Sequence, residues 1–110
     1  MFPIVSQISK THRIALASNT SEPHWKYAQK FLPFSSQLNP VIVSYLAGTL
    51  KPEKAFYERL GNESGVPADR ILFIDDLEIN VEGARKVGII GLQFSTQENL
   101  ETALTSLDLI

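Results

Sequence analysis

One stretch of this chain, Ile71-Leu72-Phe73-Ile74-Asp75-Asp76, decides its fold, because four apolar residues run directly into two adjacent carboxylates. A continuous apolar run is typical of a strand that is buried on both faces of a parallel sheet. Ligand sites of open α/β sheets form just beyond the carboxyl ends of such strands. Two neighbouring acids repel each other, so we expect a metal ion, a lysine or both to lie beside them.

Three other apolar runs predict strands of the same kind, at residues 14–17, 41–43 and 89–92. Helical spacing of apolar residues predicts helices at residues 21–32, 52–64, 78–88 and 95–107, and the first ten residues are expected to form part of another helix. Strands that alternate with helices lie parallel and are joined by right-handed crossovers. We therefore predict an α/β fold, a three-layer Rossmann-like core with about four parallel strands.

Local signals predict where three of these helices begin. Thr20 or Ser21 can cap the helix that follows the first strand. Pro52 suits the first turn of the next helix, where its missing N–H is not needed. Ser95 and Glu98 fit a capping box that opens the last helix.

Length and composition narrow the class of protein. A chain of 110 residues with a net charge of −2 forms one domain at most, residues 1–110, and it has no basic tract that would favour nucleic-acid binding. Cysteine is absent, which excludes disulfides and thiolate metal sites. No apolar run reaches the length of a membrane span, and the first residues lack the pattern of a signal peptide, so we expect a cytoplasmic protein.

Polar residues follow three of the predicted strands. Ser18-Asn19-Thr20 comes after the first strand, the segment 48–52 with Lys51 comes after the second, and Asp75-Asp76 ends the third. Because the carboxyl ends of parallel strands share one rim of the sheet, a hydroxyl, an ammonium and two carboxylates are expected to converge. That set suits a phosphate-bearing ligand with Mg²⁺, which prefers few carboxylates plus water and ligand oxygens. A solvated Lys51 without a function is an equally good interpretation of its spacing alone.

Three motifs resemble, in order, those of the haloacid dehalogenase (HAD) superfamily of hydrolases. They are Leu16-Ala17-Ser18-Asn19, Lys51-Pro52, and Asp75-Asp76 with Asn80 ahead of a helix that ends near Gly88. They are similar to the family's second, third and fourth motifs, and the resemblance covers about residues 13–95. It implies a HAD-like core and Mg²⁺-dependent phosphoryl transfer from a phosphorylated small molecule, as in members with small helical caps.

The resemblance implies roles for residues on the phosphate side of the site. Ser18 would bind the transferring phosphoryl group, and Asn19 would contact the substrate or its phosphate. Lys51 would stabilise both the nucleophile and the charge on the phosphoryl group.

On the metal side, the resemblance implies that Asp76 ligates Mg²⁺. Asp75 would orient Lys51 or a metal-bound water, and Asn80 would support this loop from the following helix.

The family's first motif, a strand that ends in Asp-x-Asp, has no match in this chain. The four aspartates are Asp69, Asp75, Asp76 and Asp108, and none has another aspartate two residues later. In the family the first Asp of that motif attacks phosphorus and the second acts as acid and base. We therefore expect the C-terminal part of a phosphatase-type enzyme, without the cap and inactive alone.

The missing strand has a consequence for the fold, because in the family it lies between the Ser-Asn strand and the Asp-Asp strand. Its absence leaves unpaired backbone groups on two interior strands, which folded proteins rarely tolerate. Another chain could supply the strand, the two strands could pair directly, or two copies could exchange elements as a homodimer. An alternative function follows, in which the gap is a docking slot of a non-catalytic interaction module.

A flavodoxin-like or response-regulator-like domain is a third interpretation, since acids at a strand end also suit those folds. The order of the elements argues against it. Such domains place the acid pair after the first strand, whereas here it follows the third predicted strand.

Overall fold

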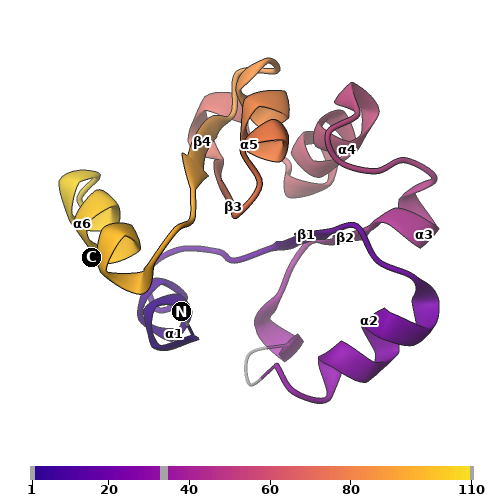
Figure 1. The fold of residues 1–110 in the computed structure, drawn as a ribbon, viewed down its shortest axis with the longest axis horizontal. Coiled ribbons are helices and arrows are strands. Elements are labelled where there is room, and N and C mark those ends of the chain that lie inside the picture. The colour runs from indigo at the N-terminus through magenta and orange to yellow at the C-terminus, as the bar shows by residue number, and fades with distance from the viewer. Residues whose placement is uncertain (1, 33–34, 110) are drawn as a thin grey trace.

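The computed structural model describes residues 2–32 and 35–109. Helices and strands alternate along this part of the chain, as predicted from the sequence (Figure 1). The elements in order are α1 (Phe2–Ile8), β1 (Leu16–Ser18), α2 (Glu22–Gln29), η1 (Ser35–Gln37), β2 (Val41–Val43), α3 (Ser44–Ala47), α4 (Lys54–Ser64), η2 (Ala68–Arg70), β3 (Leu72–Asp75), α5 (Glu78–Arg85), β4 (Ile90–Gln93) and α6 (Gln97–Ser106).

The four strands form two parallel pairs. β1 lies beside β2 with Ala17 opposite Ile42, and β3 lies beside β4 with Phe73 opposite Gly91. Within the described residues, β1 and β3 share no ladder of hydrogen bonds. The predicted parallel α/β core is confirmed, and the two strands that flank the missing one do not close up and pair directly.

Strand β3 is covered by helices on both faces, as its continuous apolar run predicts. On one face Phe73 belongs to a buried cluster with residues of α4 and α5, among them Tyr57, whose ring centroid lies 5.5 Å from that of Phe73. On the other face Leu72 and Ile74 pack against a cluster of α1 and α6. These two helices lie next to each other, beside both chain ends (Figure 1). The strand is therefore the middle layer of three.

Two predicted helix starts are wrong by one or two residues. Helix α4 begins at Lys54 and not at Pro52, because the Glu53 carboxylate folds back onto the preceding turn and accepts hydrogen bonds from Leu50 N (2.8 Å) and Thr49 Oγ1 (3.1 Å). Helix α6 is capped by Thr96, whose Oγ1 accepts a hydrogen bond from the backbone N–H of Asn99 at 3.1 Å. The capping box predicted from Ser95 is therefore one residue out of register.

The other boundaries differ by small shifts. Ser21 caps α2, one of the two residues predicted for that role, by accepting a hydrogen bond from His24 N at 3.5 Å. The ladder of β1 begins at Leu16 rather than at residue 14, with Leu16 N donating to Pro40 O at 3.1 Å. The four-residue helix α3 and the two 3₁₀ turns were not predicted.

Helices α4 and α5 approach each other closely at Gly83. A Cβ atom at this position would lie 2.9 Å from Cε2 and Oη of Tyr57 and 3.0 Å from Cβ of Pro52. Tyr57 cannot move aside easily, because it is buried and its hydroxyl donates to Asn80 O at 2.6 Å. The absence of a side chain at Gly83 therefore sets the distance between the two helices that carry Tyr57 and Asn80.

We expect Gly83→Ala to lower the free energy of unfolding by about 1–3 kcal/mol, the usual cost of overpacking a core. Urea denaturation followed by circular dichroism measures this change. The matched control is Gly61→Ala in α4, where no atom lies within 4 Å of the new Cβ and the better helix propensity of alanine should stabilise by roughly 0.5–1 kcal/mol. Equal stability of the two variants would contradict the close approach.

Candidate functional site

The ammonium of Lys51 connects the carboxyl ends of β1 and β3. Its Nζ donates to Ala17 O at 2.9 Å and to Asp75 Oδ2 at 2.6 Å. The side chains of Lys51 and Asp75 are only 10% and 6% exposed. Residues that are far apart in sequence therefore meet at one rim, as the positions of the polar loops predict, and Ser18 and Asp76 directly follow the two residues that Lys51 binds.

Asp75 is held from three directions. Besides the hydrogen bond from Lys51, its Oδ1 accepts a hydrogen bond from Leu77 N at 2.9 Å, and its Oδ2 accepts one from Asn80 Nδ2 at 3.3 Å. Burial alone would raise the pKa of the Asp75 carboxyl, but the hydrogen bond and charge of Lys51 and the N–H of Leu77 together lower the pKa below its ordinary value. Asp75 is therefore ionised at neutral pH, a charge partner for Lys51 and not a proton donor.

Asn80 joins this network to the core. Its side chain donates to Asp75, and its carbonyl oxygen accepts the 2.6 Å hydrogen bond of the Tyr57 hydroxyl. Burial, and to a lesser degree the charge of Asp75, raise the pKa of Tyr57 to about 12, so the hydroxyl stays protonated as a donor. The Phe73 ring, with its centroid 5.5 Å from Lys51 Nζ, adds an aromatic surface beside the ammonium.

Asn19 lies against the loop that carries Lys51. Its Nδ2 donates to Lys51 O at 2.9 Å, and its Oδ1 accepts from Lys51 N at 2.8 Å. Both polar atoms of the amide are therefore bonded to the backbone of Lys51. In this structure Asn19 holds the loop in position.

Ser44, which the sequence analysis did not single out, stabilises the same rim through the backbone of Thr20. Thr20 N donates to Ser44 Oγ at 2.9 Å, and Ser44 Oγ donates to Thr20 O at 3.0 Å. This reciprocal pair joins the loop after β1 to the first residue of α3. No local pattern signals it, because the partners are 24 positions apart.

Ser18 and Asp76 directly follow Ala17 and Asp75 in the chain, and the Asp76 side chain also interacts with the Asp75 carboxyl. Ser18 ends β1 and is half-buried, and its hydroxyl has no hydrogen-bond partner among the described residues. Asp76 is exposed directly after β3, and its backbone carbonyl accepts a hydrogen bond from Gln93 Nε2 at 3.3 Å. The hydroxyl and the carboxylate are therefore available to a ligand.

The donor set fits Mg²⁺ only in part. Within the described residues no group of three or more His, Asp and Glu side chains is placed to hold a metal ion. Because Asp75 is bonded to Lys51, the exposed carboxylate of the adjacent Asp76 is the one we consider for a cation. Mg²⁺ accepts one or two carboxylates when water and phosphate oxygens complete its octahedron. Asp76 thus fits a Mg²⁺ ion that arrives with a phosphate.

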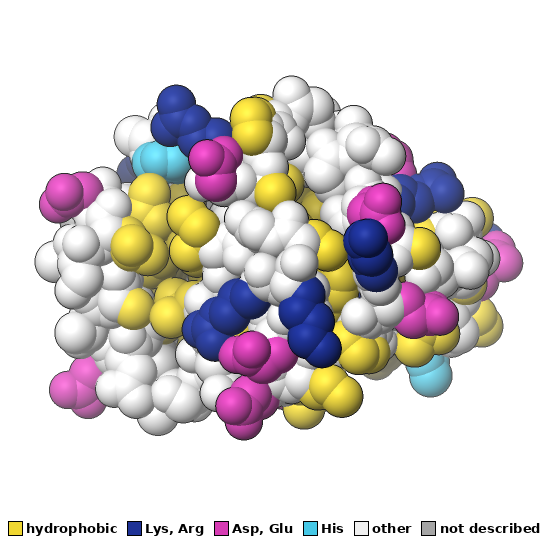
Figure 2. Space-filling model, turned by 90° about the horizontal axis from the view of Figure 1, so that it is seen from above, with side chains coloured by type: hydrophobic (Ala, Val, Ile, Leu, Met, Phe, Trp, Pro, Cys, Tyr) yellow, Lys and Arg dark blue, Asp and Glu magenta, His cyan; other side chains and the backbone are white. Residues whose placement is uncertain are grey.

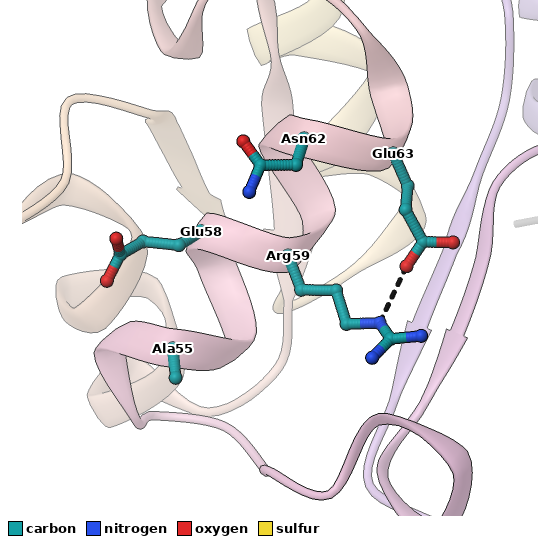
Figure 3. Close-up of a pocket in the computed structure, with 5 residues that line it drawn as sticks. All are labelled: Ala55, Glu58, Arg59, Asn62 and Glu63. Carbon is teal, nitrogen blue, oxygen red and sulfur yellow. Dashed lines mark hydrogen bonds and ion pairs between the residues drawn. The ribbon is translucent and has the colours of Figure 1, made fainter.

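A shallow depression on α4 is lined by Ala55, Glu58, Arg59, Asn62 and Glu63, and its side chains point to solvent around the 2.7 Å ion pair of Arg59 and Glu63 (Figure 3). On the face seen in Figure 2, basic side chains lie among acidic ones and form no continuous patch. Among the helices described, none is long and apolar enough to span a bilayer.

No family model matches the chain. Among curated proteins, flavin mononucleotide hydrolase 1 of Arabidopsis thaliana is 33% identical over 89 residues, which cover 80% of this chain and 36% of that protein. The chain thus spans about a third of the length of this curated relative.

Solved structures give the fold. A HAD-like family hydrolase from Porphyromonas gingivalis is 28% identical with a TM-score of 0.83, and the match covers 96% of this chain and 55% of that one. A HAD family enzyme of Bacteroides thetaiotaomicron, solved in complex with magnesium and inorganic phosphate, is 23% identical with a TM-score of 0.76, over 90% of this chain and 56% of that one. The chain therefore has the fold of the HAD-like hydrolase family and corresponds to part of that family's core.

Proposed function

We propose that Ser18, Lys51 and Asp76 form the phosphate- and Mg²⁺-binding part of a phosphohydrolase site. The observation that supports the proposal is the buried contact of Lys51 with both Ala17 O and Asp75, the residues that directly precede Ser18 and Asp76. The magnesium and phosphate in the Bacteroides enzyme and the activity named for the Arabidopsis relative support the same chemistry.

Each of the three side chains has one task. A lysine ammonium has three N–H donors, of which Lys51 uses two on Ala17 O and Asp75, so the third remains for a phosphoryl oxygen. The Ser18 hydroxyl can donate to a second oxygen of the same group. Asp76 can supply one oxygen to Mg²⁺, which would neutralise charge on the phosphoryl group when it is bound.

Asp75 acts on the ligand through Lys51 and is a positioning residue. Because its carboxylate is ionised and bonded to Leu77 N and Asn80 as well, it fixes where the ammonium lies. Asn19 fixes the backbone of Lys51 from the other side. The ammonium is thus preorganised before any phosphate arrives, which is the condition for efficient electrostatic stabilisation of a transferring phosphoryl group.

Hydrolysis needs groups that these 110 residues do not contain. Of the four aspartates, Asp75 is neutralised by Lys51, and none belongs to an Asp-x-Asp motif. We propose that the carboxylate nucleophile of the completed site comes from polypeptide outside residues 1–110. We propose that the completed enzyme acts on a phosphorylated small molecule, a monoester of the class to which flavin mononucleotide belongs.

This prediction concerns the buried ion pair of Lys51 and Asp75. Removing one partner of a buried pair leaves an uncompensated charge, so Lys51→Met and Asp75→Asn should each lower the free energy of unfolding by about 3–5 kcal/mol. The double variant should lose less than the sum, since both charges are then gone. Guanidinium denaturation measures these values, and Arg59→Met, which breaks an exposed pair, should cost less than about 1 kcal/mol.

A second measurement covers variants that are too unstable for denaturation. In Lys51→Met, the pKa of Asp75 should rise, because the cation that lowers it is gone while burial still raises it. Carboxyl carbon shifts followed against pH by NMR report this change. An unshifted Asp75 pKa together with unchanged stability would contradict the buried pair.

The next prediction concerns ligands. Titration of the pure chain with Mg²⁺ and inorganic phosphate should shift the backbone amide signals of Ser18, Lys51 and Asp76. Asp76→Asn should weaken the Mg²⁺-dependent part by about tenfold or more, because affinity for a hard cation follows ligand charge. Asp69→Asn is the matched control, since this exposed acid lies in η2 at the opposite end of β3.

The same sample should not hydrolyse p-nitrophenyl phosphate in the presence of Mg²⁺. Shifts without turnover would agree with a binding part that lacks its nucleophile. Metal-dependent turnover by the pure chain, or an undiminished affinity for Mg²⁺ in Asp76→Asn, would contradict the assignment.

A further inference from the structure

Three large apolar side chains are exposed beside the polar site. Leu50 directly precedes Lys51, Leu77 directly follows Asp76, and Ile79 lies in the first turn of α5. Their exposed fractions are 49%, 55% and 64%. Single exposed apolar side chains are common on protein surfaces, so exposure alone indicates no function. These three residues form the apolar rim, and what distinguishes them is that they flank the lysine and the acid assigned to phosphate and Mg²⁺.

Two contacts bring the loop before α4 to the start of α5. Lys51 Nζ bonds to the last residue of β3, and a Cβ atom at Gly83 would lie 3.0 Å from Cβ of Pro52. Ile79 and Gly83 are four positions apart in α5, so they lie on the same face of the helix. The loop that carries Leu50 therefore lies against the face of α5 that also carries Ile79.

Hydrogen bonds fix the backbone on both sides of the apolar rim. Leu50 N donates to the Glu53 carboxylate at 2.8 Å, and Leu77 N donates to Asp75 Oδ1 at 2.9 Å. Leu77 O accepts a hydrogen bond from Asn80 N at 3.1 Å. Because this surface is already ordered, a ligand that binds to it loses less free energy in fixing the protein.

The chemistry of a ligand follows from the side chains around the apolar rim. The rim has no side-chain donor or acceptor, so hydroxyl groups pressed against it would lose hydrogen bonds to water without replacement. An aromatic or aliphatic surface would instead remove apolar area from water on both partners. Glu78, the exposed residue between Leu77 and Ile79, disfavours a second anionic group nearby. The organic part that fits here is therefore neutral and apolar.

We propose that the apolar rim contacts an aromatic or other apolar surface on the organic part of the phosphate monoester. It thereby selects against monoesters whose organic part is only a polyol or a sugar. The inference rests on the proposed function, because Lys51 and Asp76 must hold the phosphate for the organic part to reach the rim. The three residues of the rim determine specificity and take no part in breaking the ester bond.

NMR titration of the full chain in the presence of Mg²⁺ tests this inference. The probes are 1-naphthyl phosphate and glycerol 2-phosphate, which share the phosphate group and differ in the organic part. Naphthyl phosphate should bind about tenfold more tightly, because only its organic part buries apolar area. Its ring current should also move the methyl signals of Leu50, Leu77 and Ile79 upfield, whereas glycerol 2-phosphate should leave them nearly unchanged.

Substitutions in the apolar rim should remove the preference. In Leu77→Ser and Ile79→Ser the ratio of the two dissociation constants should fall to about threefold or less, since each variant loses part of the apolar contact. The ratio cancels any change in the phosphate contacts that the two probes share. Both side chains are exposed, so the variants should stay folded.

Leu107→Ser is the matched control, because Leu107 is exposed to a similar degree, at 47%. It follows α6, which starts just after the carboxyl end of β4, so a helix of 10 residues separates it from the polar site. This variant should keep the wild-type ratio.

The competing place for a naphthyl group is an apolar groove of about 580 Å³ between β1 and β3, lined by Leu16, Leu72 and Leu104 among others. Naphthyl phosphate that shifts the signals of these residues and leaves the apolar rim unchanged would overturn the inference. Rim signals that move with protein concentration in the absence of any ligand would assign the rim to a second copy of the chain, and would also overturn it.

The two remaining outcomes separate this inference from the proposed function. Equal affinity for the two monoesters would overturn the inference and leave the phosphate site in place. Failure of both monoesters and of inorganic phosphate to bind would overturn the phosphate site and the inference together.

Discussion

The structure depends on one buried interaction, the contact of the Lys51 ammonium with Ala17 O and the Asp75 carboxylate. Among the described residues the two strand pairs share no ladder, and the Lys51 side chain bonds to a residue of β1 and to a residue of β3. Because the pair is buried, the stability of the protein depends on both partners: either charge alone would carry a large desolvation cost in the interior. The same burial keeps the ammonium in one place, which is what a phosphate site needs.

Sequence patterns were sufficient for the fold because apolar runs such as Val41–Val43 and Leu72–Asp75 are buried on the sheet whatever their exact ends. They were insufficient for the exact starts of α4 and α6. There the Glu53 carboxylate accepts a hydrogen bond from Leu50 N, and the Thr96 hydroxyl accepts one from Asn99 N. The proximity of Lys51 to Asp75 could be predicted from the parallel topology, which gathers strand ends at one rim.

The hydrogen bonds of the Asn19 side chain to the backbone of Lys51 could not be predicted. The two residues are 32 positions apart, and a bond to a backbone group requires no particular residue type at the partner position. The missing Asp-x-Asp motif predicted that the two interior strands would lack a partner, and among the described residues β1 and β3 share no ladder but flank an apolar groove. Ala17, which lines this groove, accepts the hydrogen bond of Lys51 Nζ.

The most direct test is an NMR measurement of where the Lys51 side chain lies. The structure predicts nuclear Overhauser effects from its ε-methylene protons to the Phe73 ring and upfield shifts of those protons, since Nζ lies 5.5 Å from the ring centroid. A Lys51 side chain with random-coil shifts and no contact to Phe73 or Ala17 would contradict both the buried pair and the site that is built on it.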